Sequence, residues 1–130
     1  MNGVFYRIDK FAVPAPARDE FLMHMVCTHA LLQAQEGFTG HSVLEQVAGP
    51  GEFNFVTIAE WENAEAFEQA QAAIAAARAT ANLSPQEMFE RLGIRADIAG
   101  YKPVAARSGD IRRRPSLLRG EGEGRSARRA

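Results

Sequence analysis

Three histidines, one tryptophan and a few polar residues in apolar surroundings are the side chains of this sequence that could carry out chemistry. His29 lies in an apolar helical repeat, and His41 follows a glycine near the start of a strand-like stretch. Imidazole titrates near neutral pH, so either residue could accept a proton from an acidic phenol or enol. Asn54 has apolar neighbours, and its amide is expected to need hydrogen bonds from a partner subunit or a ligand. We therefore predict catalytic roles for His29, His41 and Asn54.

Trp61 lies where the period of the sequence changes from alternation to apolar residues at every third or fourth position. In one interpretation it fills the space between a sheet and a helix together with Phe67. In the other it forms an aromatic wall of a substrate cavity, and in both a buried indole N–H needs an acceptor. Arg7 is a further candidate for the cavity wall. We predict that Tyr6, Trp61 and Tyr101 bind substrate.

The histidines also have structural interpretations. At about 100° per residue, one apolar stripe of the first predicted helix contains Phe21, Leu22, Met25, Val26, His29 and Leu32. His29 lies near the centre of this stripe, where a hydrogen-bonded core histidine is the alternative to a catalytic one. His24 lies off the stripe and is expected to be solvated. The lone Cys27 has no possible disulfide partner within the chain, and we expect it to be a small buried apolar residue.

Sequence motifs for metals and large cofactors are missing. There is no His-Glu-x-x-His pattern and no Asp-rich loop. The glycine-rich stretch 48–52 joins two strand-like segments, whereas a phosphate-binding loop opens a helix. We therefore expect no metal and no nicotinamide, flavin or nucleotide cofactor. A cavity without a cofactor fits proton abstraction from an electron-rich aromatic, whose carbanion can react with dioxygen.

The elements that position these residues follow from the periodicity. It predicts an α+β, ferredoxin-like βαββαβ fold: a four-stranded antiparallel sheet with two main helices on one face. Asn63 is the predicted N-cap of the second long helix, and residues 84–87, Ser-Pro-Gln-Glu, have the form of a capping box. The expected elements are strands at 4–13 and 94–104, a hairpin over 38–61, and helices at about 14–35, 64–81 and 85–92.

The 130-residue chain divides into two parts of different composition. Residues 1–105 carry seven Lys and Arg against thirteen Asp and Glu (7 − 13 = −6), and residues 106–130 carry eight Arg against three acids (8 − 3 = +5). We expect 1–105 to form one domain and 106–130 to be a disordered Arg-rich tail, because the tail has too few apolar residues to form a core. A solvated tail is favoured over a nucleic-acid-binding arm, since acids interrupt its short basic clusters. A tail lying on the acidic domain is a further option.

No apolar run approaches the roughly 20 residues of a membrane span, and residues 1–10 have the pattern of a strand and not of an export signal. We therefore expect a cytoplasmic protein with no membrane partner.

Both faces of the predicted sheet are apolar. In the stretch 53–61, Phe55 and Trp61 share one face, and Val56 and Ile58 share the other. Two helices cover only one face, and leaving large apolar side chains exposed forfeits about 1.5 to 3 kcal/mol each. We therefore expect a homodimer in which the second faces of two copies pack together.

Residues 3 to about 104 resemble the antibiotic biosynthesis monooxygenase superfamily, through Glu-Gly-Phe after the first helix and the stretch 58–67, IAEWENAEAF. The resemblance implies a dimeric α+β barrel, and its members include cofactor-free oxygenases. Together with the candidate cavity residues, it leads us to expect a cofactor-independent monooxygenase acting on a small aromatic or quinone-like substrate. In that mechanism His29 or His41 takes the proton, Asn54 or Tyr6 stabilises the oxyanion, and Trp61 packs on the ring. A non-catalytic small-molecule-binding or regulatory module of the same fold is the alternative.

The superfamily also includes haem-degrading enzymes and isomerases of small signalling molecules. The haem-degrading members carry an Asn on the first strand and a Trp and a His ten residues apart on the second helix. Those helix positions correspond to Ala70 and Thr80 here, and the first strand has no Asn. Isomerase-like members usually have a His where Ala70 stands. The resemblance to both groups is therefore weaker, although His24 or His29 could in principle bind iron.

Overall fold

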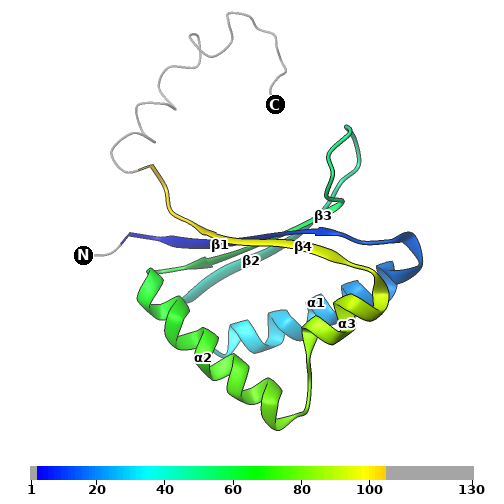
Figure 1. Cartoon of the computed structure of the whole chain (residues 1–130). Helices are drawn as coiled ribbons and strands as arrows, with labels where there is room; N and C mark the ends of the chain where they lie inside the picture. The colour runs from blue at the N-terminus through cyan, green and yellow to red at the C-terminus, as the bar shows by residue number, and fades with distance from the viewer. Residues whose placement is uncertain (1–2, 105–130) are drawn as a thin grey trace, which may run out of the picture.

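The computed structural model describes residues 3–104. Its elements are β1 (Phe5–Ala12), η1 (Ala15–Ala17), α1 (Arg18–Gln33), β2 (Phe38–Glu45), β3 (Phe55–Trp61), α2 (Ala64–Thr80), α3 (Pro85–Leu92) and β4 (Arg95–Tyr101). The four strands form one antiparallel sheet in the order β2-β3-β1-β4, and α1, α2 and α3 lie on one side of it (Figure 1). The predicted ferredoxin-like α+β fold is confirmed.

The boundaries of α2 and α3 have local causes. The side chain of Asn63 accepts a 2.8 Å hydrogen bond from the backbone N–H of Ala66, in the first turn of α2. The hydroxyl of Ser84 accepts a 3.2 Å hydrogen bond from the N–H of Glu87, in the first turn of α3. Gly93 ends α3 with a φ of 73°, a left-handed conformation that favours glycine. Both predicted N-caps are confirmed.

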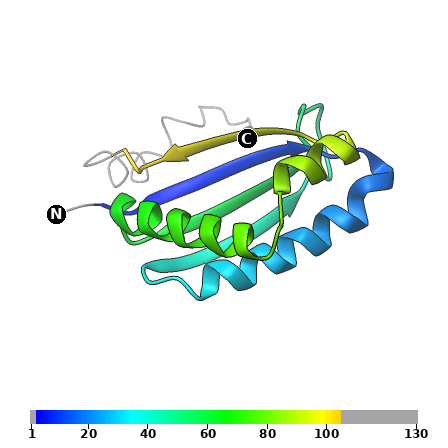
Figure 2. The same cartoon turned by 60° about the horizontal axis from the view of Figure 1, so that its bottom comes forward.

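The helix-side core of the described residues consists of two clusters, located between the sheet and the helices that Figure 2 shows in front of it. The first cluster is centred on Phe21, whose ring centroid lies 5.0 Å from those of both Phe11 and Phe55. The second contains Trp61 and Ala70, with Phe5 packed against it. The helices therefore pack on the sheet at two separate clusters, with a gap between the two clusters.

Strand β1 crosses this gap. Phe5 packs against the second cluster and Phe11 belongs to the first, so both point toward the helices. Side chains alternate along a strand, and Arg7 and Asp9 therefore point the same way. The middle of the helix-covered face thus carries a charged pair where a structural core would be apolar.

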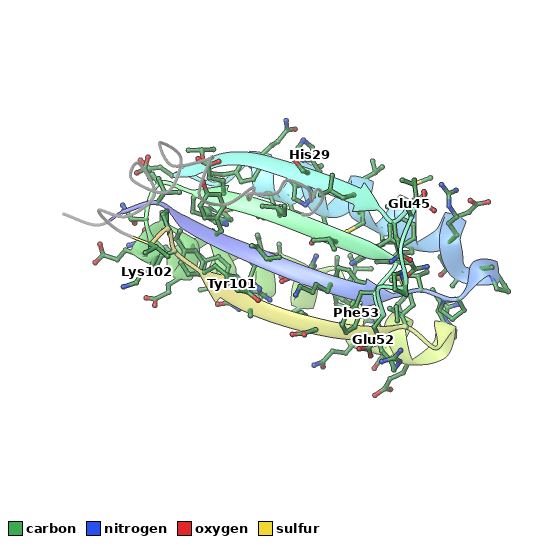
Figure 3. The ribbon with its side chains drawn as sticks, turned by 90° about the horizontal axis from the view of Figure 1, so that it is seen from above. His29, Glu45, Glu52, Phe53, Tyr101 and Lys102 are labelled. Atoms are coloured by element: carbon green, nitrogen blue, oxygen red, sulfur yellow. The ribbon has the colours of Figure 1, made fainter. Side chains whose placement is uncertain are left out.

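No described element covers the opposite face of the sheet. The alternation of the strands and their register place these apolar side chains on it: Tyr6, Ile8, Leu44, Val56, Ile58 and Tyr101. Leu44 is 50% exposed and Tyr101 43%, and Figure 3 looks onto this face, with Tyr101 labelled. We call this surface the bare face. The predicted second apolar face is therefore present in the described part of the chain.

The stripe predicted for the first helix is partly wrong. Phe21, Met25 and Leu32 are buried, but Val26 is 65% exposed. Cys27 was expected to be buried and is exposed. The packing of Phe21 on the sheet fixes the rotation of α1, and this tertiary contact outweighs the local preference of Val26 for burial.

The predicted tail, residues 106–130, lies outside the described residues, and the predicted domain boundary stays a prediction. Among the described helices, none combines the length and apolar character needed to cross a membrane.

Candidate functional site

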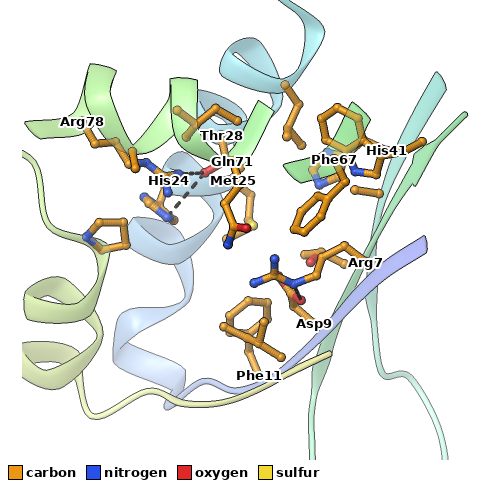
Figure 4. Close-up of a pocket in the computed structure, with 18 of the residues that line it drawn as sticks. Arg7, Asp9, Phe11, His24, Met25, Thr28, His41, Phe67, Gln71 and Arg78 are labelled. Atoms are coloured by element: carbon orange, nitrogen blue, oxygen red, sulfur yellow. Dashed lines mark hydrogen bonds and ion pairs between the residues drawn. The ribbon is translucent and has the colours of Figure 1, made fainter. Parts of the chain in front are cut away.

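A cavity of about 310 Å³ lies under the middle of the sheet, with lining residues from both core clusters (Figure 4). This volume is at the lower end of the range for small-molecule sites, roughly 300 to 1,000 Å³. Most of the wall is apolar. The polar and charged residues of the lining are Arg7, Asp9, His24, Thr28, His41, Thr57, Gln71 and Arg78.

Arg7 and Asp9 form an ion pair on the sheet side of the cavity, with 2.9 Å between Arg7 Nε and Asp9 Oδ1. The Arg7 guanidinium also lies over the ring of Phe67, 5.3 Å from its centroid. Burial raises the pKa of the Asp9 carboxyl above its usual value, although the charge of Arg7 and its hydrogen bond oppose the shift. Enclosing such a pair in a core is unfavourable unless its geometry is good, and perturbed carboxyls of this kind concentrate at functional sites.

His41 extends from β2 into the cavity wall, and His29 of α1 stands next to it. Their Nδ1 atoms lie 3.1 Å apart, and the rings are stacked with 5.2 Å between centroids. Burial lowers the pKa of His41, and the neighbouring His29 lowers it further. His41 is therefore neutral at neutral pH and can accept a proton. His29, predicted near the centre of the inward stripe, does not line the cavity and touches the site through His41.

Trp61 is 1% exposed and forms part of the cavity wall. Its ring packs edge-on against Phe38 and Phe67, with centroid distances of 5.5 and 5.8 Å. Trp61 thus combines both predicted positions, packing between sheet and helix and lining the cavity. The expected acceptor for its indole N–H is not found: Nε1 has no hydrogen-bond partner in the part of the chain that the structure describes.

Asn54, Tyr6 and Tyr101 lie outside the cavity lining. Asn54 Oδ1 accepts a 2.8 Å hydrogen bond from the N–H of Val13, and its Nδ2 donates to the Val13 carbonyl at 2.9 Å. The expectation that this amide needs a partner subunit or a ligand is wrong, because the backbone of Val13 satisfies it. Tyr6 and Tyr101 are register partners on the bare face. These positions give no support to the roles predicted for the three residues.

A polar cluster on the helix side was missed from the sequence. Arg78 Nη2 of α2 donates to Thr28 Oγ1 of α1 at 3.2 Å, and that oxygen lies 3.4 Å from His24 Nε2. His24 was expected to be solvated, but it is half-buried in the cavity wall. Burial lowers its pKa, and the charge of Arg78 lowers it further.

The sequence contains a signal for one of the residues that were not predicted and none for another. Asp9 could have been found, because alternation from Phe5 to Phe11 places it on the buried face. Arg78 could not, since its inward position depends on how α2 docks on α1.

Residues 4–82 match the family model for antibiotic biosynthesis monooxygenase. The chain belongs to this family. The matched segment runs from β1 into the loop after α2 and so includes most of the cavity wall. A comparison with curated proteins found no match.

Several solved structures share the fold of this antibiotic biosynthesis monooxygenase family member. MhuD, a haem degrader from Mycobacterium tuberculosis solved with two haems in its active site, is 24% identical, with a TM-score of 0.59 over 77% of this chain and 95% of that one. SnoaB, a cofactor-independent oxygenase from Streptomyces nogalater, is 22% identical, with a TM-score of 0.54 over 78% and 93%. A protein from Shewanella loihica is 18% identical, with a TM-score of 0.58 over 82% and 99%. At these identities the similarity shows the fold alone.

The two positions compared above with the haem-degrading branch of the family do not fit an iron site. Ala70 is buried in the second core cluster and has no ligating atom. Thr80 is exposed, and its hydroxyl donates to the carbonyl of Ala76 at 3.0 Å. The Trp and the His of the haem-degrading branch therefore have no counterpart at these positions.

Proposed function

We propose that this protein is a cofactor-independent monooxygenase that acts on a small aromatic or quinone-like substrate. The observation that carries the proposal is His41: a neutral imidazole in the wall of a mostly apolar cavity, backed by a second imidazole at 3.1 Å. Membership of the antibiotic biosynthesis monooxygenase family supports the same reaction class.

The contact between the histidines allows Nε2 of His41 to act as the base in one of its two tautomeric arrangements. One Nδ1 must donate and the other must accept, because a neutral imidazole carries a single N–H. When Nδ1 of His41 carries the proton and donates to Nδ1 of His29, Nε2 of His41 is left free to act as the base. His29 is then a positioning residue that selects the active tautomer of His41.

The reaction needs only substrate, dioxygen and this base. His41 removes a proton from an acidic carbon or hydroxyl of the substrate, leaving an electron-rich anion. For an anthrone-like methylene, the anion reduces dioxygen and forms a hydroperoxide at the same carbon. Loss of water then leaves a carbonyl, so one oxygen atom enters the product and the other leaves as water. We assign the stabilisation of the oxyanion to Arg7, whose guanidinium lines the cavity, in place of Asn54 and Tyr6.

The apolar part of the cavity fits an aromatic ring. Trp61 and Phe67 form an edge-to-face pair in the wall, and Leu32 and Ile74 lie beside them. Such surfaces bind a planar ring through buried area and favourable ring geometry. They also keep water away from the carbanion, which favours its reaction with dioxygen over reprotonation.

Oxygen uptake with a panel of hydroquinones and anthrones tests the proposal. We expect the wild type to consume one dioxygen per substrate, His41→Ala to lose about a hundredfold or more in rate, and His29→Ala to lose less. Gln33→Ala, exposed on the same helix as His29, is the matched control and should leave the rate unchanged. Unchanged activity in His41→Ala would refute the assignment of the base. Saturable binding without oxygen uptake would instead indicate the non-catalytic binding module.

The proposal extends to a homodimer formed through the bare face. Val56 and Ile58 lie on the central strand β3 and Ile8 on its neighbour β1, so the apolar surface crosses the middle of the sheet. A second copy has the same apolar surface, and a two-fold axis packs the bare faces of the two copies against each other. Sedimentation equilibrium should give twice the mass of the chain, whereas a single-chain mass at micromolar concentration would rule this arrangement out.

A further inference from the structure

The helix side of the cavity carries a positive charge without an opposite charge nearby. Arg78 lies in the last turn of α2 and is half-buried. Its hydrogen bond goes to the uncharged hydroxyl of Thr28, and no ion pair within residues 3–104 includes it. Among the described residues, Asp9 is the only carboxylate in the cavity lining, and it is paired with Arg7. The charge of Arg78 is therefore left uncompensated inside the site.

A half-buried guanidinium without an anionic partner is unfavourable. Partial burial removes water from the guanidinium and lowers the pKa of Arg78. The adjacent His24 is held in its neutral form by burial and by the same arginine. A desolvated cation is stabilised by an anion that reaches it, and a guanidinium fork matches the two oxygens of a carboxylate.

We propose that Arg78, Thr28 and His24 form a subsite for the carboxylate of an aromatic acid, which is the substrate class of this site. The inference rests on the proposed function for the aromatic ring and adds the acidic group. Arg78 binds the carboxylate, and Thr28 holds the guanidinium in place through the 3.2 Å hydrogen bond. His24, 3.4 Å from the Thr28 hydroxyl, closes the subsite on the α1 side.

The layout of the cavity gives such a substrate one orientation. Figure 4 shows Arg78 and His24 on one side of the cavity and His41 and Phe67 on the other, with Gln71 and Met25 between them and Arg7 beside Asp9 on the sheet side. A ligand whose carboxylate meets Arg78 therefore extends its ring toward Phe67 and His41. The oxidisable carbon then lies at the end of the molecule away from the carboxylate.

The subsite is also reachable from a neighbouring hollow. A second pocket of about 260 Å³ shares His24, Thr28, Arg78 and Pro85 with the cavity. Pro85 is the first residue of α3, so the positive end of that helix dipole adds to the attraction for an anion. An anionic ligand that enters through this hollow meets Arg78 before it meets the aromatic wall.

Two probes of the same shape test the subsite by calorimetry: naphthoate, which is an anion, and naphthamide, which is uncharged. The wild type should bind naphthoate about tenfold or more tightly than naphthamide, as expected for a charge-assisted hydrogen bond. Arg78→Gln should lose this preference and still bind naphthamide within about twofold of the wild type, since the apolar wall is unchanged. Retained naphthamide binding shows that the variant is folded. Arg78→Lys should keep part of the preference, and high salt should reduce it.

Arg95→Gln is the matched control, because Arg95 is exposed on β4 and paired with Glu52. It should leave both affinities unchanged. Equal binding of the two probes by the wild type, no binding of either, or an undiminished preference in Arg78→Gln would overturn the inference. Loss of the preference in Arg7→Gln with its retention in Arg78→Gln would also overturn it. Neither probe has to be oxidised, so an intact preference without any oxygen uptake would refute the proposed function and leave the carboxylate subsite standing.

Discussion

The two faces of the sheet differ in the kind of group that they enclose. The helix-covered face surrounds Arg7, Asp9 and His41 with apolar side chains. The bare face presents aliphatic and aromatic side chains such as Ile8 and Tyr101, with no described element over them. The difference indicates two uses. Ionisable groups held under helices are suited to a small molecule, and an exposed apolar surface is suited to another protein surface.

The helix-covered face also shows what the site requires from the fold. A small domain depends on a continuous core, yet the core here is divided into two clusters by the ion pair of Arg7 and Asp9. Apolar residues at these two positions would join the clusters and add buried area. The stability of the fold therefore does not explain why a charged pair, Arg7 and Asp9, lies between the two core clusters.

The largest expected effect comes from truncating the helix-side core. Phe21→Ala should lower the free energy of unfolding by about 3 to 5 kcal/mol, because Phe21 is fully buried between Phe11 and Phe55. Leu44→Ala on the bare face should lower it by less than about 1 kcal/mol at a dilution where the chain is single. Urea denaturation measures both values. Equal losses at that dilution would mean that the bare face is part of the monomer core.

Self-association should be most sensitive to a charge at the centre of the bare face. Ile58→Lys should weaken the dimer more than about tenfold, since the ammonium would be buried there without a partner. Met23→Lys adds the same charge at an exposed apolar position of α1 and serves as the control. Sedimentation equilibrium of both variants shows whether the bare face or the surface of α1 forms the dimer interface. A dimer that survives Ile58→Lys and dissociates in Met23→Lys would place the interface on the helices.

The role of Asn54 should be visible as a smaller loss of stability. Asn54→Ala removes both hydrogen bonds to the backbone of Val13 and should lower the free energy of unfolding by about 1 to 3 kcal/mol. Its rate of oxygen uptake, measured well below the melting temperature, should match that of the wild type. A large loss of rate with unchanged stability would restore the catalytic role predicted from the sequence.

The smallest expected effect is on the pH dependence of stability. Burial lowers the pKa values of His24 and His41 below the ordinary 6.5. As the pH falls, these two side chains are therefore protonated in the unfolded chain before they are protonated in the folded one. Stability should therefore fall as the pH drops below 6.5 and through the lower pKa values of the folded state. Asp9, whose pKa is raised, contributes in the opposite direction above its ordinary 3.8. Thermal melts of a His24→Gln and His41→Gln double variant should show a flatter profile below 6.5, and an unchanged slope would contradict the assigned burial.

The order and type of the elements could be predicted because their signals are local. Asn63 and Ser84 cap the helices that follow them, and the alternation in 53–61 marks a strand whichever neighbours it pairs with. Membership of the family was likewise visible in the stretch 58–67.

The site could be predicted only in part, because it depends on contacts between distant elements. Trp61 was found because the alternation of its strand places it on the inward face. His41 was predicted from its residue type and its place after Gly40, and its inward position depends on the β-bulge between Phe38 and Gly40, which the sequence does not reveal. The cluster of Arg78, Thr28 and His24 needed the docking of α2 on α1, a contact separated by 50 residues in the chain. Tyr6 and Tyr101 look like ligand-binding residues in the sequence, but their parity on β1 and β4 places them on the bare face.

The claim that the helix-covered face, and not the bare face, holds the small molecule can be tested by nuclear magnetic resonance. Trp61 is the only tryptophan of the sequence, so its indole N–H gives one assignable signal. Titration with a naphthol under nitrogen should shift this signal and those of Phe67 in a saturable manner, while the ring signals of Tyr6 and Tyr101 stay in place. Saturable shifts of Tyr6 and Tyr101 with an unmoved Trp61 signal would contradict the account.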